Sequence, residues 1–561
     1  MNVKEEYPWL KNYPKGVPKE INPHEYESLI ELLEESFTKY SDLTAFECMG
    51  KAITFAELKE QSLHFAAFLQ QELKLQKGDR IAIQLPNLLQ YPIAAFGAMR
   101  AGLILVNTNP LYTAREMEHQ FKDSGAKAII ILANFACNLE KIIHKTSIEH
   151  VITTEIGDRL GGLKGTVVNF VVKRIKKMVP SYHLPQAIKF NYTLQKGSKY
   201  SFQKPVIKGT DTACLQYTGG TTGVSKGAVL SHTNLVANVE QMTIWMKVKL
   251  KEREEIIITA LPLYHIYAFT VNCLGMFKLG AKNILITNPR DMKAFIKELG
   301  KYPFTVMTGV NTLYNALLNQ PDFAKLDFSH FKVASAGGMA VQQVVAEKCK
   351  EITGVPIAEG YGLTETSPVL TTNRIDGHER IGMIGLPVPS TQLIIADDNE
   401  QEVPIGEAGE IYAKGPQVMS GYWEKEEETR HVFSKEGWFK TGDIGIMDED
   451  GYIKIIDRKK EMINVSGFNV YPNDIENIVA GHPKVLEVGA IGVSDDRSTE
   501  VVKICVVKKD QSLTAEELKA YCKENMTAYK VPKYIEFRDE LPKSNVGKIL
   551  RRLLKEGETK V

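Results

Sequence analysis

Short β-branched segments alternate with amphipathic helical segments over most of this 561-residue chain. From about residue 80 the order is IAIQLPN, GLILVNTNP, the helical stretch TAREMEHQFKDSG and AKAIIILA, and the alternation returns between residues 282 and 354. Strands that alternate with helices are typical of parallel sheets, because a crossover helix joins two parallel neighbours. The sequence therefore predicts an α/β fold of mainly parallel sheets covered by helices.

Local signals divide the chain further. Thr113 and Glu116 form a T-x-x-E capping box and Gly125 follows as a stop, which predicts a helix between them. Residues from about 380 to 456 have short strands and Gly/Pro turns, which predict a small antiparallel β subdomain. After the charged stretch DRKK, a T-x-x-E helix and two strands indicate a separate, smaller α+β domain. We predict an N-terminal domain of residues 1–457 and a C-terminal domain of residues 458–561.

Net charge and targeting signals limit the partners and the location. A formal charge of only +1 removes the overall case for nucleic-acid binding. The N-terminus lacks the apolar stretch of a secretory signal, and no run approaches the length of a membrane-spanning helix. Seven scattered cysteines without a C-x-x-C pair are typical of reduced thiols. We expect a cytoplasmic protein that does not bind nucleic acid.

The stretch YTGGTTGVSKGA at residues 217–228 combines glycines, hydroxyl side chains and Lys226. Glycines expose backbone N–H groups and the lysine adds a positive charge, so the loop suits a polyphosphate. It differs from the common NTPase loop, because Lys226 stands between Ser225 and Gly227. From the residues alone, a surface linker remains the alternative.

Four later motifs accompany this loop: EGYGLTET at 359–366, GWFKTGDIG at 437–445, KIIDRKKEMINVSGFNVYP at 454–472 and LPKSNVGKILRR at 541–552. Together they resemble the core motifs of the adenylate-forming superfamily of acyl-CoA synthetases, luciferases and adenylation domains. The longer match GWFKTGDIGIMDEDGYIKIIDRKK, with PNLLQYP and PLYHIYA, is similar to bacterial long-chain fatty-acid:CoA ligases. The resemblance implies ATP-dependent ligation of a long-chain fatty acid to coenzyme A through an acyl-adenylate, with Mg²⁺ as the ion and AMP and pyrophosphate as products.

The resemblance also assigns the phosphate site. When a carboxylate attacks a phosphate, one anion approaches another, so cations and oriented N–H donors are required. Glu365 is expected to ligate Mg²⁺ and Thr364 to reach the α-phosphate, although a surface carboxylate is the alternative for Glu365. The residues assigned to the phosphates are Thr218, Gly219, Gly220, Thr221, Thr222, Gly223 and Lys226.

The same resemblance places the nucleoside. Asp443 is expected to accept hydrogen bonds from both ribose hydroxyls, with Arg458 assisting. Tyr361 is expected to pack against adenine, and a core aromatic is its alternative. The remaining residues assigned to the nucleotide site are Gly337, Gly338, Glu359, Gly360 and Gly362.

Three further assignments follow from the family. Lys548 resembles the catalytic lysine of a mobile C-terminal domain, which pivots near Lys460 between the two half-reactions. That rotation would bring the loop around Ser466 and Gly467 to the coenzyme A channel. His265 resembles the histidine that lines the acyl and carboxylate site, with Phe269 as a gate; a satisfied core histidine is the alternative.

Two other functions stay open at this stage. A fatty acyl-AMP ligase that loads a carrier protein would use the same motifs, and a fatty-acid-binding protein without catalysis would share the fold. Chain-length preference and a homodimer are left undetermined by the sequence. Residues 164–180, KGTVVNFVVKRIKKMVP, are either a basic amphipathic helix that contacts the anionic inner membrane surface peripherally or a buried strand followed by a charge cluster.

Overall fold

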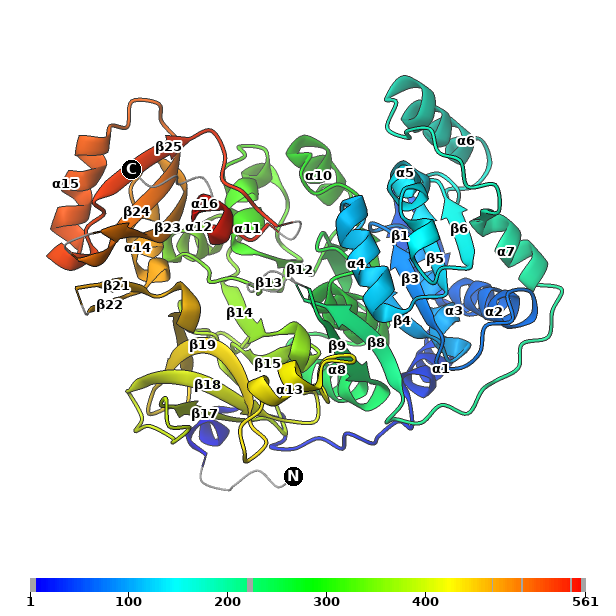
Figure 1. Ribbon diagram of the computed structural model, residues 1–561, viewed down its shortest axis with the longest axis horizontal. Coiled ribbons are helices and arrows are strands. Elements are labelled where there is room, and N and C mark those ends of the chain that lie inside the picture. The colour runs from blue at the N-terminus through cyan, green and yellow to red at the C-terminus, as the bar shows by residue number, and fades with distance from the viewer. Residues whose placement is uncertain (1–6, 219–224, 467, 496–497, 545–546, 556–561) are drawn as a thin grey trace.

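A computed structural model describes residues 7–218, 225–466, 468–495, 498–544 and 547–555 (Figure 1). Two large sheets form most of the molecule. The seven-stranded sheet is parallel except where its last two strands pair. In spatial order its strands are β7 (Ile188–Lys189), β6 (His150–Thr154), β5 (Ala128–Leu132), β3 (Arg80–Gln84), β4 (Ile104–Asn107), β8 (Thr212–Tyr217) and β9 (Gly227–Ser231).

The nine-stranded sheet has a parallel centre with antiparallel pairs at both ends. Its strands are β16 (Leu386–Pro387), β15 (Val369–Thr372), β14 (Ile357–Gly362), β13 (Val333–Ala336), β12 (Val306–Gly309), β10 (Ile256–Thr259), β11 (Lys282–Leu285), β1 (Thr44–Cys48) and β2 (Lys51–Thr54). The α/β fold predicted from the sequence is therefore confirmed.

Helices cover the sheets in layers. One hydrophobic core contains residues of both large sheets together with α1 (Leu29–Lys39), α2 (Phe55–Gln71), α3 (Gln90–Arg100) and α8 (His232–Met246). Every residue of α3 is buried, because this helix packs within that shared core. Separate cores lie under α4 (Ala114–Ser124) on the seven-stranded sheet and under α10 (Met292–Leu299), α11 (Asn311–Leu318) and α12 (Gln343–Thr353) on the nine-stranded sheet.

A four-stranded antiparallel sheet lies beside the nine-stranded sheet and contains β17 (Gln392–Ala396), β18 (Ala408–Lys414), β19 (Phe439–Met447) and β20 (Ile453–Arg458) (Figure 1). The short helix α13 (Glu426–Val432) packs against β19. This sheet confirms the small antiparallel subdomain expected from the Gly/Pro turns.

The described residues from Ile463 onward, here called the C-terminal lobe, have their own sheet and core. The strands are β21 (Ile463–Val465), β22 (Phe468–Val470), β23 (Val485–Asp495), β24 (Thr499–Lys508) and β25 (Tyr534–Arg538), with helices α14 (Pro472–Ala480), α15 (Ala515–Asn525) and α16 (Arg551–Lys555). The lobe packs against α11 and α12 of the large domain, on the left in Figure 1. The boundary at residue 457 and the mobility of the lobe stay predictions.

Capping signals agree with the observed helix ends. Thr113 accepts a hydrogen bond from the backbone N–H of Glu116, and Gly125 ends α4 in the left-handed conformation with φ of 59°. Thr514 caps α15 in the same way. Of the two alternatives for residues 164–180, the structure has the helix, α6 (Gly162–Phe170), followed by a π-helical turn at Val171–Ile175.

No helix in the described ranges has both the length and the apolar character that crossing a bilayer requires.

Candidate active site

A cavity of about 640 Å³ lies where the large domain, the antiparallel sheet and the C-terminal lobe meet. Its wall includes residues at or just beyond the carboxyl ends of β8, β12, β13 and β14, which is where ligands bind in open α/β sheets. Fourteen of the predicted site residues line it: Thr218, Lys226, His265, Gly337, Gly338, Gly360, Tyr361, Gly362, Thr364, Glu365, Asp443, Arg458, Lys460 and Lys548. Motifs separated by more than 300 residues in the chain therefore meet in one cavity.

Other predicted residues lie elsewhere. Glu359 lines an adjoining cavity of about 460 Å³, which shares Asp443 and Lys548 with the first. Ser466 is exposed at the turn between β21 and β22, outside the residues that line either cavity. Gly219, Gly220, Thr221, Thr222, Gly223 and Gly467 fall outside the described residues.

Glycine is required at two positions of the cavity wall. Gly338 has φ of 81°, a left-handed conformation that residues with a side chain rarely adopt. A Cβ atom on Gly362 would lie 1.9 Å from the carbonyl oxygen of Pro368. Any larger residue at either position would distort the wall.

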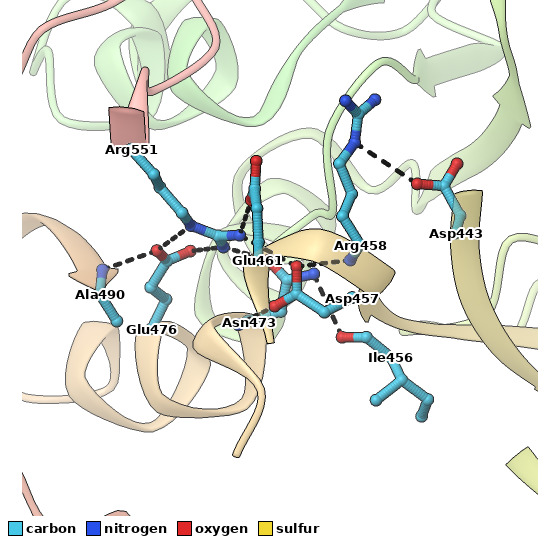
Figure 2. Close-up of polar contacts among 9 residues, drawn as sticks. All are labelled: Asp443, Ile456, Asp457, Arg458, Glu461, Asn473, Glu476, Ala490 and Arg551. Carbon is cyan, nitrogen blue, oxygen red and sulfur yellow. Dashed lines mark hydrogen bonds and ion pairs between the residues drawn. The ribbon is translucent and has the colours of Figure 1, made fainter. Parts of the chain in front are cut away.

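Asp443 forms the centre of a polar group in the cavity. The Tyr361 hydroxyl donates a hydrogen bond of 2.7 Å to Oδ2. Nε of Arg458 lies 3.4 Å from Oδ1, as Figure 2 shows. Burial raises the pKa of Asp443, while the Arg458 guanidinium opposes that rise. Because each carboxylate oxygen can accept more than one hydrogen bond, Asp443 can still accept bonds from a pair of ligand hydroxyl groups. Tyr361 lines the cavity, belongs to a hydrophobic core of the large domain, and holds Asp443 with its hydroxyl.

Glu365 and Lys226 lie on either side of Tyr422, a residue that the motifs did not indicate. The Tyr422 hydroxyl donates a 2.6 Å hydrogen bond to Oε1 of Glu365, and burial raises the pKa of this carboxyl. Nζ of Lys226 lies 5.2 Å from the centre of the Tyr422 ring and forms an ion pair with Glu428. Residues 421–423 pair with β9, which follows the glycine-rich loop, and this pairing brings Tyr422 next to Glu365 and Lys226. Only a pairing between distant segments could have revealed this residue.

A tight turn presents Lys548 to the cavity. The backbone N–H of Lys548 donates to Oγ of Ser544 at 3.1 Å, and the Ser544 N–H donates to the Lys548 carbonyl at 2.7 Å. Thr312 of α11 donates a 2.9 Å hydrogen bond to the carbonyl of Gly547, which fastens the turn to the large domain. Burial, assisted by the Arg458 charge, lowers the pKa of Lys548 to about 8.

His265 lines the cavity together with several apolar residues. Its Nδ1 accepts a long hydrogen bond of 3.3 Å from the backbone N–H of Tyr267, and removal from water lowers its pKa to about 4. The imidazole is therefore neutral at pH 7 and adds no charge to this wall. Phe269 does not line the cavity; it is fully buried in the core and packs against Tyr91. The apolar residues that share the wall with His265 are Met242, Leu261, Ile266, Val271, Val310 and Val369.

Glu359 holds two loops beside the cavities through backbone hydrogen bonds. Its two carboxylate oxygens accept hydrogen bonds from the backbone N–H groups of Val341, at 3.2 Å, and Gly382, at 3.0 Å. Burial raises the pKa of Glu359 to about 7. Because Val341 follows the loop with Gly337 and Gly338, Glu359 orients that loop.

The site can therefore bind a compact anionic group next to an apolar one. Lys226, Arg458 and Lys548 supply positive charge, while Asp443 and Glu365 supply carboxylate oxygens for hydroxyl groups or a hard cation. The apolar residues in the lining suit a hydrocarbon substituent.

The chain is similar to known proteins over nearly its whole length. Residues 33–423 match the family model described as AMP-binding enzyme, and residues 474–548 match the AMP-binding enzyme C-terminal domain. A curated long-chain-fatty-acid--CoA ligase of Escherichia coli O6:H1 is 57% identical over 548 residues, which cover 98% of each chain. A relative of the same name from Bacillus subtilis is 39% identical over 555 residues, again 98% of each chain.

Two solved structures have the same overall fold as this chain. ATP-bound MatB from Rhodopseudomonas palustris has a TM-score of 0.81 at 27% identity and matches over 94% of this chain and 98% of that chain. The anthranilate CoA ligase AuaEII in complex with anthranoyl-AMP has a TM-score of 0.85 at 24% identity, covering 96% and 99%, and shares the fold.

Proposed function

This chain belongs to the AMP-binding enzyme family, and on that premise we propose that it is an ATP-dependent ligase that joins a long-chain fatty acid to coenzyme A. The reaction passes through an acyl-adenylate and releases pyrophosphate and then AMP. The observation that carries the proposal is that Lys548, Asp443 and Glu365 line one cavity together with apolar residues. A nucleotide and a fatty acyl group need these two surfaces side by side.

The first half-reaction requires compensation of negative charge. The fatty carboxylate attacks the α-phosphorus of ATP, the bond to the pyrophosphate breaks, and charge accumulates on the phosphoryl oxygens. We assign Lys548 to the reacting carboxylate and α-phosphate, Lys226 and Thr364 to the phosphates, and Asp443 to the ribose hydroxyls. Because these groups are already held in the cavity, little reorganisation is needed as the charge develops.

Glu365 is the proposed ligand for Mg²⁺. A carboxylate oxygen is a hard ligand, and Mg²⁺ in nucleotide sites is usually held by one or two carboxylates together with phosphates and water. The described residues include no group of three or more His, Cys, Asp or Glu side chains that could hold a metal ion, so the nucleotide would supply most of the ligands. When bound, the ion would neutralise phosphate charge.

The second half-reaction is attack by the thiolate of coenzyme A on the acyl carbonyl, with AMP as leaving group. It needs no nucleophile from the enzyme. We propose that residues 458–561 rotate as a domain about Lys460 between the two steps, which would withdraw Lys548 and bring Ser466 to the coenzyme A channel. The exposed position of Ser466, with φ of 52° at a hairpin turn, supports a role at a surface that closes only after rotation.

The decisive assay is formation of AMP and pyrophosphate from ATP and oleate, with and without coenzyme A. We expect AMP release to depend on coenzyme A and oleoyl-CoA to accumulate. A carrier-protein ligase would instead turn over with a phosphopantetheinyl carrier protein and ignore coenzyme A. A binding protein without catalysis would release no pyrophosphate under either condition.

We also propose peripheral contact of α6 and the turn after it with the cytoplasmic membrane surface. Leu163 is 85% exposed and Ile175 65% exposed, so the apolar side chains of this segment are not part of the core. In Figure 1, α6 projects from the edge of the seven-stranded sheet, away from the C-terminal lobe. Basic residues with apolar neighbours suit an anionic lipid surface, where a fatty-acid substrate would reside. The basic residues are Lys164, Lys173, Arg174, Lys176 and Lys177.

A further inference from the structure

Arg551, three residues after Lys548, is the centre of a polar network between the C-terminal lobe and the segment around Lys460 (Figure 2). Its guanidinium contacts four side chains. Nε donates to Oε1 of Glu476 at 2.9 Å, and one terminal nitrogen donates to Oε2 of the same residue at 2.7 Å. The other bonds go to Asp457 at 3.0 Å, Glu461 at 2.5 Å and Asn473 at 2.5 Å.

All donors of the guanidinium are used. Arginine has five N–H groups in a planar fork, and five hydrogen bonds leave this side chain, which is only 12% exposed. Lysine has three donors around a point and could not reproduce the paired contact with Glu476 together with the other bonds. The site therefore selects for arginine by geometry as well as by charge.

The partners come from both sides of Lys460. Asp457 is in β20, whose sheet belongs to the large domain, and Glu461 directly follows Lys460. Glu476 and Asn473 are on α14 of the C-terminal lobe. Asp457 is 1% exposed and also accepts a 2.8 Å hydrogen bond from the backbone N–H of Asn473. Arg551 thus joins α16 and α14 to the last strand before the proposed pivot.

Arg551 also neutralises negative charge that would otherwise destabilise this part of the fold. Three carboxylates, those of Asp457, Glu461 and Glu476, face one guanidinium in a region with little water. Loss of the cation would leave buried like charges close together, and they would move apart or become protonated. A rotation that separates Asp457 from Arg551 would have the same consequence unless another cation replaced it.

We propose that Arg551 is a positioning residue that fastens the segment around Lys460 to the C-terminal lobe and thereby keeps Lys548 in the cavity during adenylate formation. The proposal rests on the proposed function, since it takes Lys548 to serve the first half-reaction. The Arg551–Asp457 contact then determines what fraction of the molecules has the lobe in this pose. It spans the pivot, whereas the Arg551–Glu476 contact lies within the lobe.

Two substitutions test this, Arg551→Lys and Asp457→Asn. Each is assayed for ATP–pyrophosphate exchange with oleate, which reports adenylate formation, and for oleoyl-CoA formation from supplied oleoyl-AMP. Loss of a charge-assisted bond predicts a decrease of about tenfold or more in exchange for both variants. Thioester formation should stay within about twofold of wild type or rise, because that step does not use this pose.

Lys555→Gln is the matched control, since it removes a positive charge from an exposed position on the same helix. It should leave both half-reactions unchanged. Equal losses of both half-reactions in Arg551→Lys and Asp457→Asn would overturn the proposal and indicate a general structural role. Asp457→Asn nearly preserves side-chain shape, so the test does not depend on a variant with a disrupted lobe.

The pose itself can be measured without activity. Spin labels at Glu351→Cys of α12 and Glu516→Cys of α15 occupy exposed positions on the large domain and the lobe, and Cys137→Ser removes the one native cysteine that is not buried. Pulsed electron spin resonance should give a second distance population, enlarged in Arg551→Lys and Asp457→Asn but not in Lys555→Gln. Identical distributions in all four proteins would refute the proposal. If wild type released no pyrophosphate, the proposed function would fail while this distance measurement would still test the contact.

Discussion

Lys548 shares the cavity with Arg458 and Asp443, and these neighbours act on its charge in opposite directions. Burial and Arg458 favour the neutral amine, while Glu461 and Asp443 favour the ammonium ion. The resulting pKa of about 8 is far below the ordinary value of 10.5, so the residue is close to losing its charge at physiological pH. Binding of a polyanion such as ATP would raise this pKa, which couples protonation of Lys548 to nucleotide binding.

Replacement of Lys548 by alanine separates the two half-reactions. We expect ATP–pyrophosphate exchange to fall by about 100- to 1,000-fold, because a cation that stabilises the transition state is lost. Thioester formation from supplied oleoyl-AMP should be largely spared. The two rates are measured on the same preparation, with Lys543→Ala as a control for the exposed lysine at the start of the same turn. A parallel decrease in both half-reactions would contradict the assignment.

The pKa of Lys548 predicts a pH dependence. A lysine is charged below its pKa, so kcat/KM for ATP, which reports the free enzyme, should be constant below about pH 8 and decline above it. The kcat profile should decline at higher pH, because bound ATP raises the pKa again. In Lys548→Arg the rate should be lower but the decline near pH 8 should disappear, since guanidinium stays charged. A decline that persists in Lys548→Arg would assign it to another group.

At the scale of elements, strand β14 contributes both a residue that lines the cavity and a residue that holds two neighbouring loops in place. Residues Ile357–Gly362 form this strand, and Glu359 and Tyr361, two positions apart in it, make different contacts. Tyr361 reaches Asp443, while Glu359 reaches the loops at Val341 and Gly382. The motif EGYGLTET thus contains one residue that faces the cavity and another that fixes its wall.

Glu359→Gln tests this support through stability. Burial raises the pKa of Glu359 from 4.5 to about 7, so the folded state binds a proton more tightly than the unfolded state. The stabilisation by this proton is complete below about pH 4.5 and is lost as pH rises through 7. The free energy of unfolding of wild type, minus that of the variant, should therefore decrease by on the order of 3 kcal/mol between these limits. Denaturant unfolding at several pH values gives this difference, and a difference independent of pH would reject the raised pKa.

The sequence predicted the helices and strands better than the long-range contacts that hold the site together. The strands and the caps of α4 and α15 follow from local patterns, because β-branched runs and capping boxes act over a few residues. The fourteen residues of the cavity were assigned by the resemblance of their motifs to a known family. The sequence did not predict Tyr422 and Thr312, because each reaches the site through a contact with a segment that is distant in the chain. Glu359 was assigned to the nucleotide by its motif, yet its carboxylate bonds to backbone groups of two loops.

At the scale of the whole molecule, the proposed pivot directly follows a residue that is tied to the antiparallel sheet. Lys459 forms ion pairs with Asp398 at 2.7 Å and Glu410 at 3.2 Å on the antiparallel sheet, whereas Lys460 is exposed. This arrangement leaves the backbone at Lys460 as the point where φ and ψ can change without breaking those pairs.

Lys460→Pro should hinder that change. Proline restricts φ to about −65°, so we expect ATP–pyrophosphate exchange to stay within a few-fold of wild type and oleoyl-CoA formation to decrease by about tenfold or more. Lys460→Ala, which removes the charge but leaves the backbone free, should retain both reactions. Normal overall turnover in Lys460→Pro would place the pivot elsewhere.

The proposed membrane contact would also involve the whole molecule, because α6 would have to face the bilayer while the cavity stays accessible. Changing Lys173, Arg174, Lys176 and Lys177 to Gln removes four positive charges, each worth about 1 kcal/mol near an anionic surface. We expect wild type to sediment with anionic vesicles at low salt and to dissociate at high salt, since salt screens such charges. The variant should stay in the supernatant in both conditions.

A second variant with Leu163 and Ile175 changed to Ser should bind weakly at low salt, because it keeps the charges but loses exposed apolar side chains that would enter the lipid. Full sedimentation of the Gln variant at low salt would show that this segment is not the anchor.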